Sequence, residues 1–286
     1  MNLLIAAIAS LISVLGYSLI SIYIGRVGQK YGAFWTGFWI QILGLPLTLL
    51  FLPIFGLKLS WGIYLLPIAI FGIFMSFVFI LYCKVLSIGP VSIVQAISKL
   101  GVLITFLLAI IFFHETVTLF RILGGILIIA GAIMVSVDVK SLANKKIKLL
   151  TKAVPLALLQ AVASGILFVI LGIGVKYFDG FSTSVGTRLF TVPTFIFISL
   201  TQTSSKKLHI GSSWKILFFI AFLDVVSFIL YNLSVQTYQI SFASIMQGTI
   251  PVATAIISYL FFKERLSLSQ RVGILIAVLG AISLGM

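Results

Sequence analysis

The chain has 286 residues, of which 61% are hydrophobic and 8% are charged, and its mean hydropathy is +1.29. Since roughly a quarter of the residues in a soluble domain are charged, this composition excludes a soluble globular protein and indicates an integral membrane protein. The net charge of +14 comes from basic residues between the apolar segments, which is typical of membrane-flanking loops rather than of nucleic-acid binding. The single cysteine, Cys83, excludes an internal disulfide and a cysteine-rich metal site.

A helix that crosses a bilayer needs about 20 mostly apolar residues, and ten segments meet this requirement. In chain order they are residues 3–24, 34–55, 61–83, 90–113, 119–137, 153–176, 181–201, 214–236, 241–262 and 266–285. No segment resembles a cleaved signal peptide, because the first apolar run is too long and lacks a basic leading region.

The two halves of the chain repeat each other at an offset of 149 residues. Residues 81–135 align without a gap on residues 230–284, and the match includes glycines, a glutamate and a serine. The matching pairs include Ser92 with Ser241, Glu115 with Glu264, Gly124 with Gly273, and Gly131 with Gly280. Each half contains five predicted spans, and an odd-numbered repeat inserts in the opposite orientation to its twin. We therefore predict an all-α membrane protein with ten transmembrane helices in two inverted five-helix repeats, residues 1–138 and 153–286, joined by a basic linker, residues 139–152.

The basic residues are divided unequally between the two faces of the membrane. If the spans alternate, both termini lie on a face with three basic residues, Lys58, Arg121 and Lys176, and the other face receives 14, five of them in the central linker. The positive-inside rule then places the linker in the cytoplasm and both termini outside.

The repeat resembles a known transporter family. The second half has a span that opens with Ser241-Phe242-Ala243-Ser244, then Pro251, Lys263-Glu264-Arg265-Leu266, Gly273 and Gly280. This pattern is similar to the repeat of the drug/metabolite transporter superfamily, and more specifically to its EamA-type ten-helix branch. The first half departs from it with Val102 in place of the proline. The resemblance implies export of amino acids or related metabolites, and it implies cytoplasmic termini, against the charge count.

Three charged residues lie well inside predicted spans: Asp224, Lys99 and Arg188. A central Asp, Lys or Arg costs roughly 2.5–3.5 kcal/mol on insertion scales, so such residues are candidates for function or for ion pairing. Asp224 shares a helix face with Ser227 and Tyr231. A carboxyl group in a medium of low dielectric favours its neutral form, so Asp224 is a candidate proton or ammonium site. The alternative is a permanently neutral structural carboxyl.

The fourth and ninth spans carry matching polar stripes, which we expect to face each other across the pseudo-two-fold axis. The fourth has Ser92, Gln95 and Lys99, with the candidate Ser98 next to Lys99, and the ninth has Ser241, Ser244 and Gln247. Lys99 is a candidate to bind a carboxylate or phosphate, or to pair with Asp224 in the empty state; its structural alternative is a snorkelling lysine. Arg188 is expected either to reach the headgroups or to bind an anion. Glu115 and Glu264 are interpreted as structural residues near helix N-termini.

The sequence predicts a secondary-active transporter in the cell membrane that exports a small polar metabolite such as an amino acid. Its expected partners are the solute, the lipid bilayer and protons as a coupling ion. Two alternatives stay open: an exporter of lipophilic cations, which Lys99 would repel, and a flippase for lipid-linked metabolites. An enzyme is not expected, because the spans lack a nucleophile–base pair. No cofactor, metal site or ATP-binding P-loop is expected.

Overall fold

The computed structural model describes residues 2–60, 62–89, 91–136, 147–201, 214–262 and 266–284, and these residues form helices and short connections without a strand. The helices in chain order are α1 (Asn2–Tyr31), α2 (Ala33–Leu49), α3 (Leu52–Phe55), α4 (Leu65–Ile88), α5 (Val91–Lys99), α6 (Gly101–Phe113), α7 (Leu119–Ser136), α8 (Ile147–Tyr177), α9 (Gly180–Thr201), α10 (Trp214–Thr237), α11 (Ile240–Gln247), α12 (Ile250–Phe262) and α13 (Leu268–Ser283). Helices suit a bilayer because they satisfy every backbone hydrogen bond within one segment.

Each of the ten predicted spans corresponds to helical structure, although the lengths differ. Eight helical segments among the described residues are long and apolar enough to cross a membrane, and the helices Ala33–Leu49 and Leu268–Ser283 are shorter. The second predicted span, residues 34–55, is interrupted, since α2 ends at Leu49 and α3 follows as a separate turn. Helix α8 begins at Ile147 and includes the end of the predicted linker, whereas residues 139–146 lie outside the described part.

The fourth and ninth predicted spans are broken helices, which differs from the prediction of continuous ones. The fourth consists of α5 and α6, which meet at Leu100, and the ninth consists of α11 and α12, which meet at Gly248 and Thr249. Leu100 and Thr249 correspond at the 149-residue offset. Pro251 lies in the first turn of α12. N–H groups in the first turn make no hydrogen bond within the helix, so a proline, which has no N–H, fits there. The break in the first repeat forms without a proline, and Gly101 beside it packs closely on α8, since a Cβ atom there would lie 2.3 Å from the carbonyl oxygen of Ala161.

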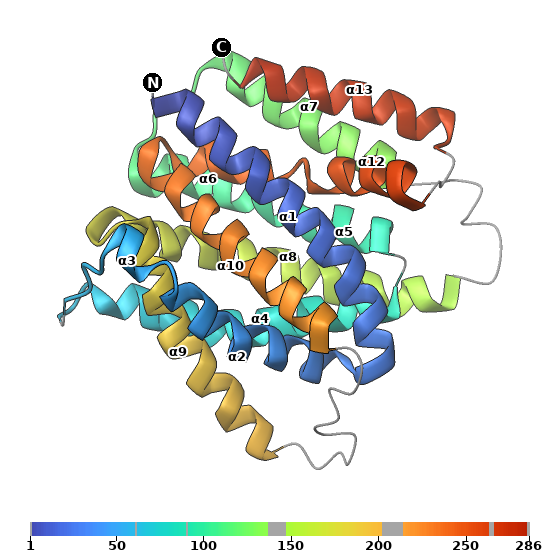
Figure 1. The fold of residues 1–286 in the computed structure, drawn as a ribbon. Coiled ribbons are helices and arrows are strands. Elements are labelled where there is room, and N and C mark those ends of the chain that lie inside the picture. Colours follow the sequence, from blue (N-terminus) through green and yellow to red (C-terminus); the bar gives the residue numbers. More distant parts are fainter. Residues whose placement is uncertain are drawn as a thin grey trace.

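The helix contacts follow the repeat. Helix α1 packs on α10 as its counterpart α8 packs on α4, and α2 packs on α10 as α9 packs on α4. Figure 1 shows α7 and α13 side by side along one edge of the molecule, with α2 and α9 towards the other. The four helices α1, α4, α8 and α10 lie between these edges and surround the interior.

Two pairs of glycines bring α7 and α13 into close contact. A Cβ atom at Gly131 would lie 2.5 Å from the carbonyl oxygen of Gly273, and one at Gly280 would lie 2.7 Å from that of Gly124. Small residues allow such approach of helix backbones in membranes. Because Gly124 is next to Gly280 and Gly131 is next to Gly273, the two corresponding helices run antiparallel.

The chain ends lie on the same face of the molecule (Figure 1), and Ala6 and Leu284 share one buried apolar cluster. We call this the terminal face. Near it, the Glu115 carboxylate accepts hydrogen bonds from the backbone N–H groups of Ile240 and Ser241, at 2.9 and 3.0 Å. Glu115 therefore caps the N-terminus of α11 from the other repeat, which confirms its structural interpretation. Glu264 lies outside the described residues.

Candidate functional site: a charged cavity between the repeats

A cavity of about 140 Å³ lies in the interior, and side chains from both repeats line it. Six of the seven predicted site residues reach it: Ser98, Lys99, Arg188, Asp224, Tyr231 and Gln247. The seventh, Gln95, is fully buried beside Tyr82 and does not line the cavity. The structure thus brings together residues from α5, α9, α10 and α11 that are up to 149 positions apart.

Asp224 and Arg188 form a buried ion pair at the cavity wall. Arg188 Nη2 donates to Asp224 Oδ2 at 2.8 Å, and the side chains are 3% and 7% exposed. Arg188 Nη1 donates to Gln41 Oε1 at 2.9 Å, so the guanidinium joins α9 to both α10 and α2. Gly44 makes room for it, since a Cβ atom there would collide with Arg188 Nη1. The planar guanidinium, with several donors in fixed directions, suits such a bridge.

This arrangement corrects two sequence predictions. Arg188 does not reach towards the headgroups, because α9 packs between α2 and α10 and turns this residue inwards. Asp224 does not pair with Lys99, because Arg188 already occupies the carboxylate. Whether Lys99 or Arg188 pairs with Asp224 depends on how the helices cross. The pattern of a single sequence does not contain that information.

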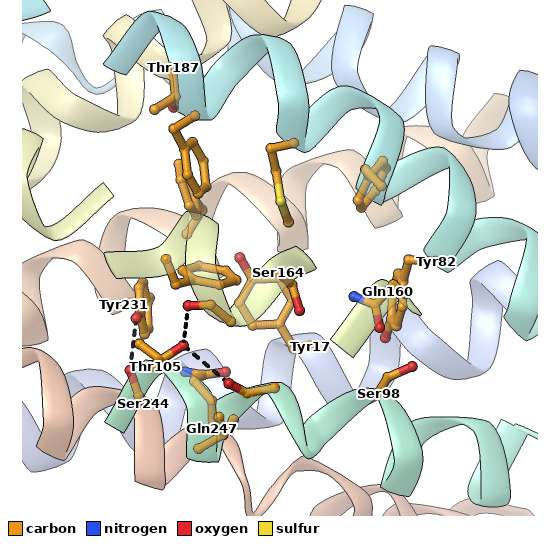
Figure 2. A pocket seen from close by; sticks show the side chains of 18 of the residues that line it. Tyr17, Tyr82, Ser98, Thr105, Gln160, Ser164, Thr187, Tyr231, Ser244 and Gln247 are labelled. Carbon is orange, nitrogen blue, oxygen red and sulfur yellow. Dashed lines mark hydrogen bonds between the residues drawn. The ribbon is translucent and has the colours of Figure 1, made fainter. Parts of the chain in front are cut away.

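Lys99 lies at the break in the fourth span. It is the last residue of α5, it is partly buried, and it forms no ion pair with any residue that the structure describes. The neighbouring Ser98 is 4% exposed, and its hydroxyl has no hydrogen-bond partner in the described part of the chain. The same holds for the Oε1 atom of Gln160, from α8. Figure 2 shows Ser98, Gln160 and Tyr82 together on one side of the cavity.

The other side of the cavity is aromatic and hydroxyl-rich. Figure 2 shows Tyr231, Ser244 and Gln247 near one another there, with the Tyr231 and Ser244 hydroxyl oxygens 3.3 Å apart. Gln247 Nε2 donates to the Ser13 hydroxyl at 3.0 Å, which ties α11 to α1. The Phe168 ring packs edge-on against Tyr231, with ring centroids 5.2 Å apart. Phe71, Phe79 and Phe228 also line the cavity.

Sequence reasoning did not single out several cavity residues as site residues. They are Tyr17, Gln41, Tyr82, Gln160, Ser164, Thr187 and Thr191. Each is a polar residue within a predicted span, so the signal existed, but hydrogen bonding between helices explains such residues equally well. Tyr82 is the counterpart of Tyr231 in the repeat, and this match is the one additional clue in the sequence.

Only a few polar residues of the cavity follow the repeat. At the 149-residue offset Tyr82 corresponds to Tyr231 and Ser98 corresponds to Gln247, whereas Gln41 and Gln160 have the apolar counterparts Phe190 and Leu11. The charged residues have uncharged counterparts: Gly248 for Lys99, Trp39 for Arg188, and Met75 for Asp224. The repeat accounts for the frame of the cavity, and its charges are departures from the repeat.

Comparison with known proteins identifies the fold and the family. A solved structure described as "Crystal structure of protein" superposes with a TM-score of 0.79 at 14% sequence identity, over 97% of this chain and 94% of the other. At that identity the likeness concerns the fold alone. No curated protein matches the sequence. The model of the EamA-like transporter family matches residues 4–137 and again residues 151–286. The chain therefore belongs to the EamA-like transporter family, whose members are membrane transporters of the drug/metabolite transporter superfamily.

Proposed function

We propose that the protein is a secondary-active exporter of a small polar metabolite, such as an amino acid, and that the cavity holds the solute. The observation that carries this proposal is the buried cavity with charged side chains from both repeats. Lys99 comes from the first repeat, and the Asp224–Arg188 pair comes from the second. A polar solute that contacts both groups would connect the two halves of the molecule.

Size and chemistry support a small solute. A volume of about 140 Å³ gives room for roughly ten water-sized groups, which suits a metabolite better than a lipid. Buried charges are costly in a membrane and mark solute and ion pathways. The cost of burying Asp224 and Arg188 is partly offset by their mutual contact, and Gln41 satisfies a further donor.

The proposed mechanism is alternating access between two inverted repeats, in the cell membrane with the central linker in the cytoplasm. The antiparallel contact of α7 with α13, which are counterparts, is the geometry that inverted repeats require. The broken spans α5–α6 and α11–α12 would serve as the elements that bend. Protons are the proposed coupling ion, and Asp224, whose carboxylate contacts Arg188 at the cavity wall, is the proposed proton site.

One observation favours a second candidate, an exporter of lipophilic cations. Phe71, Phe168 and Phe228 lie in mutual contact at the cavity wall, with centroids of 5.7 Å for Phe71–Phe168 and 6.2 Å for Phe71–Phe228. Aromatic faces attract cations. Lys99 in the same cavity repels them, so the first proposal is preferred.

Flux in proteoliposomes tests the proposal. The purified full-length protein is reconstituted, and the uptake of a lipophilic cation and of a panel of labelled amino acids and other small metabolites is measured with and without a pH gradient. We expect flux of at least one of them, and its loss in Asp224→Asn protein that still inserts. Lys58→Gln is the control, since that side chain is 72% exposed on the terminal face. Undiminished flux in Asp224→Asn would overturn the site assignment, and flux of lipophilic cations alone would favour the second candidate.

A further inference from the structure

We propose that the cavity selects an organic monocarboxylate, a solute with one negative charge and an apolar body, over a zwitterion or a cation. This inference rests on the proposed function, because it assumes that the cavity is the solute site. It narrows the class of solute, and it follows from the balance of charges that line the cavity.

The three charged side chains of the cavity are two cations and one anion. When all are ionised their sum is +1, and a low-dielectric interior makes an unbalanced charge costly. An occupant with a charge of −1 neutralises the cavity. A zwitterion leaves the imbalance unchanged, and a cation increases it.

Asp224, the one acid among the described lining residues, already has a cationic partner. Its Oδ2 accepts from Arg188 at 2.8 Å, and its side chain is 7% exposed. A solute ammonium would have to share a carboxylate whose charge the Arg188 guanidinium already balances, and Gln41 also holds that guanidinium in place. The structure therefore offers a solute cation a far weaker partner than it offers a solute anion.

The groups that would receive a carboxylate lie together at the break between α5 and α6. Lys99 is a cation that forms no ion pair with the described residues. The Ser98 hydroxyl and the Gln160 amide oxygen are buried without a partner in the described part of the chain. A serine hydroxyl and a glutamine amide can each donate to a carboxylate, and the orientation of an amide is not fixed by its shape. Gly101 and Val102, at the start of α6, line the cavity wall next to these groups.

The apolar residues of the cavity wall indicate which chemical group the other end of the solute carries. Phe71, Phe168 and Phe228 form a contiguous aromatic cluster, and Met75 and Phe79 line the cavity as well. Such a wall gains from burying apolar surface and offers flat rings for stacking. An aryl or branched alkyl group fits it better than a second polar head does.

The test uses three probes with the same benzyl group and different charges: 3-phenylpropanoate, phenylalanine and phenylalanine amide. Binding to the purified full-length protein is measured as the ligand-dependent shift of thermal unfolding at constant pH. We expect 3-phenylpropanoate to bind at least tenfold more tightly than phenylalanine, and phenylalanine amide to bind most weakly. Lys99→Gln should weaken 3-phenylpropanoate at least tenfold and leave phenylalanine amide unchanged or improved, whereas Lys99→Arg should retain the preference for the anion.

Matched controls separate the subsite from general damage. Ser98→Ala should weaken the anion alone, whereas Ser136→Ala should change no probe, since Ser136 is equally buried but its hydroxyl bonds the Ala132 carbonyl in α7. Tighter binding of phenylalanine than of 3-phenylpropanoate, no binding of the anion at millimolar concentration, or equal weakening of all probes by Lys99→Gln would overturn the inference. A protein that transports amino acids but prefers the zwitterion would refute this inference and leave the proposed function intact.

Discussion

The ion pair between Arg188 and Asp224 yields the sharpest prediction about stability. Replacing either residue alone, as Arg188→Gln or Asp224→Asn, leaves the other charge buried at a site that is 3–7% exposed. Removing one partner of a buried pair costs about 3–5 kcal/mol, whereas replacing both removes the uncompensated charge as well. We therefore expect each single variant to be strongly destabilised and the double variant to lie within about 2 kcal/mol of the wild type.

The assay follows from the single cysteine. Cys83 is fully buried, so a thiol-reactive fluorescent dye reports unfolding during a thermal ramp without an added label. Each single variant should lower the midpoint by on the order of 10 °C, from about 2–4 °C per kcal/mol for a chain of this size. The double variant should recover most of that loss, with a coupling free energy of at least about 2 kcal/mol. If the loss in the double variant equals the sum of the single losses, the two charges do not interact and the pairing is wrong.

Three further predictions concern the frame of the molecule. Gly131→Ala should destabilise the protein by about 1–3 kcal/mol, because the new methyl group collides with the Gly273 backbone. Gly37→Ala is the control: the nearest atoms to its new methyl group lie at 3.5 Å, so it should stabilise the protein by about 0.5–1 kcal/mol in the same dye assay. Glu115→Ala should speed hydrogen exchange at the backbone amides of Ile240 and Ser241 with a loss of about 1 kcal/mol, and unchanged exchange would refute the capping role. A reporter fused to the C-terminus should be active outside the cell, as the charge count predicts. Activity in the cytoplasm would show that the predicted orientation in the membrane is wrong.

The repeat explains how much of the fold the sequence could predict. The glycines at residues 124, 131, 273 and 280 helped to identify the repeat, and the structure places these glycines against one another. Apolar length located the ten helical regions, because the bilayer sets that length. The break at Leu100 has no proline to indicate it, and the Gly248 and Pro251 that flank the break at Thr249 are residues that continuous membrane helices also tolerate.

The site was predicted less completely, for a physical reason. The cost of an intramembrane charge singled out Asp224, Lys99 and Arg188, and all three line one cavity. The sequence offered a Lys99–Asp224 pair as one alternative, and the structure pairs Asp224 with Arg188 instead, because contacts between α9 and α10 depend on helix crossing and rotation. Gln41 and Gln160 were not assigned to the site because a polar residue in a span is often a packing contact rather than a cavity lining.

Alternating access through the cavity is the central claim, and the accessibility of one engineered thiol tests it most directly. Ser98→Cys places a thiol in the cavity wall, and the wild type, whose Cys83 is fully buried, is the control. A membrane-impermeant thiol reagent is applied from either side of sealed proteoliposomes. The account predicts reaction from both sides, slowing of that reaction by a transported solute, and loss of flux upon modification. Full modification with undiminished flux, or access from one side only under every condition, would contradict it.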